Sequence, residues 1–236
     1  MAGFTLKTKR DAGSVKESTG SSFIGSSGVY PAKIDFVSLE ETDKGAVRFN
    51  INLEVNGNKQ TIYGNTVQNK DGSENTIGTN LLNKLLVIAG MAEGQEPDVE
   101  TETHKVGKDG TATEFLVITD LSGMEIQIQV KEVFTKYEGN IQRALEPYNF
   151  FRVDGATAAE IVASETDKTV KFGDQLAKIL AKEATTKPLY KENKGTNEAA
   201  PTEDEVKAYI TAKAKGGAAT PKSTVTTPKK AFFGKK

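Results

Sequence analysis

Residues 47–63 have the sequence VRFNINLEVNGNKQTIY, in which apolar and polar side chains alternate without a break as far as Val55. A period of two is typical of a half-buried strand, so this segment predicts a strand with one core face and one solvent face. Asn56-Gly57 follows and favours a type I′ hairpin, because both central positions of that turn need a positive φ. We therefore expect a returning strand at about residues 59–63. The outer face would then carry Lys59, Thr61 and Tyr63 beside Arg48, Asn50 and Asn52.

Two further elements flank this hairpin. Residues 30–39 alternate in the same way and predict a strand before it, with Lys33 on the polar face. Residues 64–76 are rich in Gly, Asn, Asp and Ser and indicate a loop. Leucine and isoleucine then recur at helical spacing over residues 77–88, and Gly90 is expected to end that helix.

The rest of the predicted barrel lies between residues 91 and 133. Residues 91–112 are acidic and glycine-rich and indicate a long connection, after which residues 114–119 and 124–133 are expected to form a second hairpin. The order is three strands, a helix and two strands, which is that of the oligonucleotide-binding (OB) barrel, a five-stranded, partly open Greek-key barrel. The predicted fold class is thus mainly β with added helices. Other small barrels and β-sandwiches give similar alternation and remain alternatives.

Composition divides the chain into four parts. We expect a flexible N-terminal arm at 1–28, an OB-fold single-strand-binding domain at 29–155, a helical extension at 156–215 and a disordered basic tail at 216–236. Within the extension, helices are predicted at 172–184 and 203–215. The second begins with Thr202 and Glu205 at the spacing of a capping box.

Charge is segregated along the chain. The formal net charge of the 236 residues is −1, but residues 206–236 hold eight lysines and no carboxylate, so residues 1–205 carry −1 − 8 = −9. The chain has no cysteine, which excludes disulfides and thiolate metal sites. No segment approaches the roughly 18 apolar residues that span a bilayer, and the first residues do not resemble a signal peptide. These features predict an intracellular protein that does not enter a membrane.

Catalytic motifs are missing from the sequence. His104 is the single histidine, and it falls in the expected acidic connection without metal-ligand spacing. There is no Walker A loop and no G-x-S-x-G elbow. We therefore predict no enzyme activity, no cofactor and no metal, although a site built from carboxylates alone is not excluded by a sequence.

Single-strand binding is better supported by the residue types. Proteins that hold single strands combine cations for phosphates with aromatic rings on which bases stack. The candidates are Lys7, Lys9, Arg10, Lys33, Arg48, Asn50, Lys59, Tyr63, Lys70, Lys131, Tyr137, Arg143 and Arg152. Each has a simpler interpretation, because an outward cation is usually a solubilising charge, and the aromatic residues after the last expected strand are at least as suited to sealing the barrel end.

Four segments resemble single-stranded DNA-binding proteins of tailed bacteriophages: Ser27–Ile34, Phe49–Glu54, Thr79–Leu86 and Phe150–Gly155. The similarity covers roughly residues 1–165 and lies in pattern and layout rather than in an invariant motif. It implies sequence-tolerant binding of single-stranded DNA in replication and recombination, beside phage replication proteins, in the cytoplasm of the infected bacterial host.

The lysine-ending tail more narrowly resembles the proteins of lytic podophages that carry a virion RNA polymerase. That resemblance implies activation of the host RNA polymerase through Lys235 and Lys236, together with an exposed tyrosine for which Tyr63 is the candidate, and Phe232 and Phe233 would add apolar anchors. The tail departs from the commoner replicative pattern, which is acidic. A phage structural β-sandwich, or a regulator that binds only a protein partner, remains an alternative.

Overall fold

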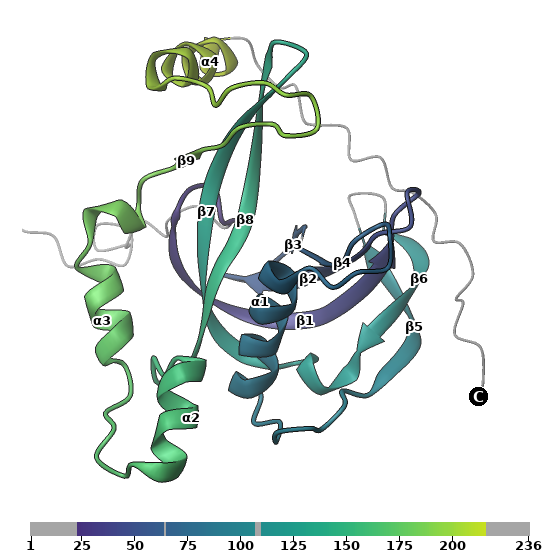
Figure 1. The fold of residues 1–236 in the computed structure, drawn as a ribbon, viewed down its shortest axis with the longest axis vertical. Helices are drawn as coiled ribbons and strands as arrows, with labels where there is room; N and C mark the ends of the chain where they lie inside the picture. The colour runs from purple at the N-terminus through teal and green to yellow at the C-terminus, as the bar shows by residue number, and fades with distance from the viewer. Residues whose placement is uncertain (1–22, 64, 107–109, 216–236) are drawn as a thin grey trace, which may run out of the picture.

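The computed structural model describes residues 23–63, 65–106 and 110–215. Their strands form one nine-stranded sheet (Figure 1). The strands are β1 (Gly28–Glu41), β2 (Val47–Val55), β3 (Asn58–Ile62), β4 (Thr66–Gln68), β5 (Val99–Val106), β6 (Thr111–Ile118), β7 (Glu125–Tyr137), β8 (Asn140–Arg152) and β9 (Leu189–Tyr190). The helices are α1 (Thr76–Ile88), α2 (Ala158–Thr166), α3 (Asp174–Leu180) and α4 (Glu203–Lys215), with 3₁₀ turns η1 (Thr119–Leu121) and η2 (Glu183–Thr185).

The β2–β3 hairpin and the helix α1 confirm the local predictions. Asn56 and Gly57 have φ of 50° and 78°, both positive as the type I′ turn requires. The helix α1 ends in a Schellman motif: Gly90 has φ of 89°, and the N–H of Met91 donates to the carbonyl of Leu86 at 3.2 Å. These elements form from local sequence because turn and cap residues fix them.

The strand β1 joins the parts of the sheet. One edge pairs with β2, while the other pairs first with β7 (Gly28–Lys33) and then with β6 (Val37–Leu39). A β-bulge between Ile34 and Phe36 bends the strand between its two partners. At the bend, the backbone of Ile34 exchanges hydrogen bonds with Gly123 and Met124, both at 2.8 Å. The sheet therefore branches at the bulge.

Several expectations about the second half of the fold are wrong. Segments 114–119 and 124–133 do not form a hairpin, because β6 pairs with β5 and β7 pairs with β8. The expected connection at 91–112 contains β5, and the expected loop at 64–76 contains β4. The five-strand count is therefore also wrong. The open antiparallel sheet, with a helix after its first strands, is consistent with an OB-like layout.

The core lies between the inner face of the sheet and α1. The helix packs against β4 and β8, and it buries Leu81, Leu85 and Ile88. From the strands, the largest buried core side chains are Ile34, Phe49, Ile51, Leu53, Ile62, Ile118 and Phe150. Phe150 and Phe151, expected after the last strand, belong to β8 and are 2% and 0% exposed, so both are buried. These side chains leave one face of β1–β3 directed away from the core.

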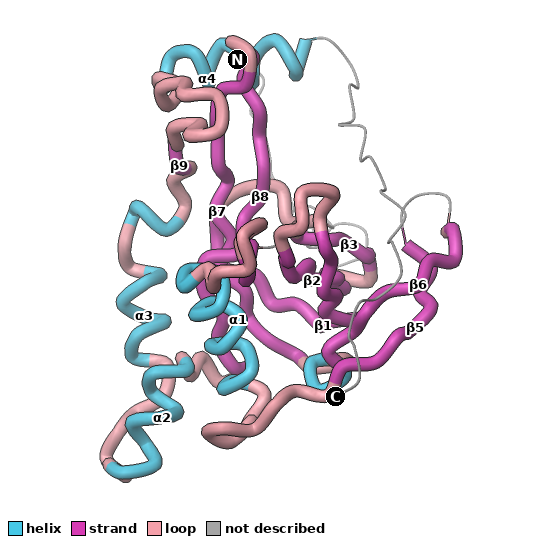
Figure 2. Tube along the Cα trace, turned by 45° about the vertical axis from the view of Figure 1, so that its right-hand side comes forward, coloured by secondary structure: helices cyan, strands magenta, loops and turns pink. Residues whose placement is uncertain are grey.

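The C-terminal elements run along the β7–β8 hairpin, which rises from the rest of the sheet to α4 (Figure 1). The strand β9 pairs with β7 in parallel, and the Phe134 ring contacts Tyr190 and Tyr209. The capping box predicted for α4 is confirmed, with the N–H of Glu205 donating to Oγ1 of Thr202 at 3.3 Å. In Figure 2, α2 and α3 lie on the opposite side of the molecule from the β5–β6 hairpin. No helix within the described ranges is both long and apolar enough to cross a membrane.

Candidate nucleic-acid interface

The face of β1–β3 that points away from the core is polar, and we call it the outer face. Strand register places Phe36, Ser38 and Glu40 of β1, Arg48, Asn50, Asn52 and Glu54 of β2, and Lys59 and Thr61 of β3 on it. Asn50 and Asn52 are 5% and 8% exposed, and Ser38 is 1% exposed. Buried polar side chains are costly unless they find partners, so an exterior face that buries three of them is unusual.

Hydrogen bonds within the outer face hold its side chains in place. The Glu40 carboxylate accepts from the Arg48 guanidinium at 3.0 Å and from the Asn50 amide at 2.8 Å. The Thr61 hydroxyl donates to Oδ1 of Asn52 at 2.6 Å. Among the described residues, the buried Oγ of Ser38 has no hydrogen-bond partner. The outer face is therefore largely preorganised, with one hydroxyl left over.

The β5–β6 hairpin, which we call the arm, brings aromatic residues to the outer face. The His104 ring stacks on Phe36 with centroids 3.8 Å apart and an interplanar angle of 15°, and the Phe115 ring lies 5.3 Å from Phe36. Nε2 of His104 lies 2.6 Å from Oε2 of Glu102. The expectation that His104 is a loop residue is wrong, since it lies within β5. Phe36 faces the arm, and not the core, because the β1 bulge reverses its side.

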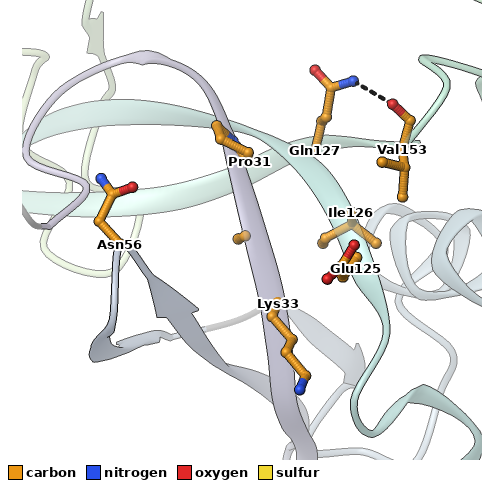
Figure 3. A pocket seen from close by; sticks show the side chains of 8 residues that line it. Pro31, Lys33, Asn56, Glu125, Ile126, Gln127 and Val153 are labelled. Atoms are coloured by element: carbon orange, nitrogen blue, oxygen red, sulfur yellow. Dashed lines mark hydrogen bonds between the residues drawn. The ribbon is translucent and has the colours of Figure 1, made fainter.

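At the other end of β1, the outer face continues into an open pocket of about 380 Å³ (Figure 3). Figure 3 shows Gln127 and Val153 on one side of β1 and Asn56 on the other. The Gln127 amide donates to the Val153 carbonyl at 3.1 Å. Lys33 is exposed there and pairs in register with Glu54 and Glu125, so carboxylates flank it on both neighbouring strands.

Two predicted contacts lie near the outer face. Tyr63 follows directly after β3 and is 53% exposed, which leaves part of its ring accessible for stacking. Lys70 is exposed in the turn between β4 and α1, where its carbonyl lies 3.8 Å from the position that a Cβ on Gly45 would occupy. The β1–β2 turn and this lysine are therefore neighbours.

Three other candidates lie on β7 and β8. Arg143 pairs with Glu132 and also donates to the carbonyl of Gly25. Tyr137 is 44% exposed at the far end of β7. Arg152 donates to both carboxylate oxygens of Asp154, at 3.0 and 2.6 Å, and this hydrogen bonding holds the pKa of Asp154 below its usual range. The structure does not bring these residues together with the outer face.

Lys131 is buried. Its ammonium group donates to the carbonyls of Ala184, Thr185 and Lys187, and the side chain ties η2 to β7. Burial lowers the pKa of the Lys131 ammonium. A cation that is 5% exposed and satisfied by carbonyls is not available to a phosphate, so we leave Lys131 out of the interface.

Some candidates cannot be placed. Lys7, Lys9, Arg10, Phe232, Phe233, Lys235 and Lys236 lie outside the described residues. Within the described ranges, histidine, aspartate and glutamate form no group of three or more that could hold a metal ion.

Carboxylates neutralise four of the seven predicted phosphate-binding cations that lie in the described part of the chain. Arg48 pairs with Glu40, Lys59 with Asp35 at 2.7 Å, Arg143 with Glu132 and Arg152 with Asp154. A phosphate would therefore have to displace a carboxylate from each of them, which reduces the gain from each contact. Sequence reasoning missed these pairs because their members lie on different strands or across a turn. Sequence reasoning also missed Ser38 and Phe115. The sequences of their strands do not indicate that another segment covers the outer face.

Comparison with known proteins identifies no family. No protein-family model matches the sequence, and no curated protein matches it. A solved structure titled as yeast RPA bound to ssDNA is similar at a TM-score of 0.25 and 12% sequence identity, and the match covers 70% of this chain and 99% of that chain. A likeness of that size establishes neither fold nor function.

Proposed function

We propose that the protein binds single-stranded DNA through the outer face, with little sequence preference and without a catalytic step. The observation that carries this proposal is the set of rings at the outer face: Tyr63 is exposed, and His104 and Phe115 are partly exposed, on a surface whose buried amides are held in place by hydrogen bonds. Single-strand binders combine accessible rings with cations, because rings stack on any base while cations meet the phosphate backbone. The strands of OB-fold barrels present nucleic-acid sites on the corresponding face.

The proposed binding mode assigns different roles to the exposed residues. Tyr63 offers a ring for stacking, which is worth about 1 to 3 kcal/mol per base. Lys33 is an exposed cation at the pocket and Lys70 is an exposed cation beside the β1–β2 turn, while Arg48 and Lys59 reach phosphates by exchanging their carboxylate partners. Because phosphate contacts release counterions, affinity should fall with salt.

A direct test compares a dye-labelled oligo-dT with a duplex of the same length by fluorescence anisotropy at about 0.05 to 0.2 M NaCl. We expect clear preference for the single strand, and equal affinity for the duplex would contradict the proposal. Tyr63→Ala should lose about 1 to 3 kcal/mol of binding free energy. Tyr137→Ala is the matched control, since that tyrosine is similarly exposed but lies at the far end of β7.

The biological setting and a second activity are further proposals, supported by the resemblance to phage proteins. They place the protein in replication and recombination in the cytoplasm of an infected bacterium, with phage replication proteins as partners. They also assign the tail, through Phe232, Phe233, Lys235 and Lys236, to docking on the host RNA polymerase. One observation favours a separate tail function: α4, which precedes the tail, is held at the end of the β7–β8 hairpin by the Lys136–Glu205 ion pair at 2.7 Å.

Deletion of residues 232–236 separates the two activities. We expect the shortened protein to keep most of its single-strand affinity, because the outer face is intact, and to lose binding to the host polymerase in a pull-down with purified components. Substitution of Lys235 and Lys236 by glutamine, with both phenylalanines kept, distinguishes charge from apolar anchoring. Normal polymerase binding by the deletion variant would refute the tail assignment.

A further inference from the structure

His104 occupies a position where its charge state changes the electrostatics of the outer face. Its ring covers Phe36, and its side chain is 24% exposed. Its hydrogen-bonding partner, Glu102, is 33% exposed on the same side of β5. With neutral imidazole the pair carries −1, and with imidazolium it carries no net charge. A negative charge at this edge opposes phosphates, and its neutralisation removes that opposition.

We propose that His104 makes the affinity for single-stranded DNA depend on pH, so that protonation of its ring, held between Phe36 and Glu102, strengthens binding at the arm. This inference rests on the proposed function. The arm would then form part of the binding surface, with the His104 and Phe115 rings beside the bound strand. Histidine is suited to this role because it changes charge between about pH 5 and 8.

The groups that face His104, other than Glu102, are mainly uncharged. Thr113 lies directly opposite on β6, and Phe115 and Phe36 contribute rings, so these neighbours carry no charge. On β5, Glu100 shares the side of Glu102 and is the other carboxylate on that side of the strand. Of the charges on the outer face, Glu40 is paired with Arg48, and Lys59 is paired with Asp35.

The sequence makes the experiment unusually selective. His104 is the only histidine of the chain, and the chain has no cysteine. The α-amino group also changes charge between pH 5.5 and 8.0, so a change in affinity across this window is assigned by comparison with His104→Gln, in which the α-amino group is unaltered. The binding constant for oligo-dT is measured by anisotropy at both pH values, at constant ionic strength and with the full-length protein.

For the wild-type protein we expect binding about two- to fivefold tighter at the lower pH, the size of one exposed charge interaction. His104→Gln should abolish the difference, and Glu102→Gln should bind more tightly at pH 8.0. Glu114→Gln is the matched control, because it removes the same charge from the opposite side of the arm, where Glu114 is exposed. It should keep the wild-type pH dependence.

The outcomes distinguish the inference from the function on which it rests. If His104→Gln and wild type show the same ratio of affinities at the two pH values, the role of His104 is refuted while single-strand binding stands. If Glu102→Gln and Glu114→Gln behave alike, the pairing argument is refuted even should the histidine variant fold poorly. Absence of single-strand binding by the wild-type protein at either pH would overturn both proposals.

Discussion

Replacement of Asp35 by asparagine should strengthen single-strand binding. The Asp35 carboxylate lies 2.7 Å from Nζ of Lys59, whose side chain is 66% exposed. Exposed pairs of this kind are worth about 0.2 to 1 kcal/mol. A phosphate that contacts Lys59 must first compensate for the free energy of this ion pair before the contact adds to the binding free energy. Asp35→Asn removes the competition and one repulsive charge, so we expect up to about fivefold higher affinity at about 0.1 M salt.

Salt dependence gives the same prediction a second readout. Each phosphate neutralised on a single strand contributes about −0.7 to the slope of log K against log salt concentration. If wild-type Lys59 remains with Asp35 in the complex, Asp35→Asn should steepen the slope by about 0.7. Anisotropy titrations of labelled oligo-dT at four NaCl concentrations measure both quantities, with Glu114→Gln as the variant of equal charge change. Equal behaviour of the two variants would refute the view that Lys59 meets DNA.

Three further predictions concern the scaffold. Gly78→Ala should destabilise the protein by at least about 2 kcal/mol in urea unfolding, because a Cβ there would lie 1.9 Å from the carbonyl oxygen of Thr66. Gly25→Ala is the control: its Cβ meets nothing closer than 4.0 Å, so it should change the free energy of unfolding by less than about 0.5 kcal/mol. Lys131→Met should cost about 2 to 3 kcal/mol in the same assay, since three carbonyls lose their donor, and an unchanged midpoint would contradict the buried clamp. Hydrogen bonding to Lys136 and Thr202 lowers the pKa of Glu205 to about 2. The ionised Glu205 carboxylate therefore stabilises α4 above the usual glutamate pKa, and this stabilisation is lost as pH falls toward 2. Amide hydrogen exchange in residues 203–215 should rise over that pH range, and it should rise less in Glu205→Gln.

The elements that the sequence predicted well are those with local signals. Alternation in β2, the Asn56-Gly57 turn, the glycine that ends α1 and the capping box of α4 all act within a few residues, and each agrees with the structure. Composition misled at β5, where glutamates and threonines alternate in a segment that looked like an acidic connection. The alternation was present, but acidic residues are poor strand formers and hid it.

The candidate site was predictable only in outline. The alternation in β2 predicted that Asn50 and Asn52 share one face of the sheet, and the strand register in the structure places both on that face. Their burial was not predictable, because the polar face of one strand carries no information about what another segment lays over it. The position of Phe36 depends on a bulge, and a one-residue shift moves a side chain to the opposite face. Likewise, the burial of Lys131 follows from carbonyls more than fifty residues away.

The branching of the sheet at β1 has a consequence for synthesis on the ribosome. The partner on one edge, β2, is made almost at once, but the other edge pairs with β6 and β7, as far along the chain as Val130. At translation rates of about 5 to 20 residues per second, that edge waits roughly 5 to 20 seconds for its partners. An unpaired edge recruits strands from neighbouring chains, so nascent copies crowded on one message are exposed to mispairing during this interval.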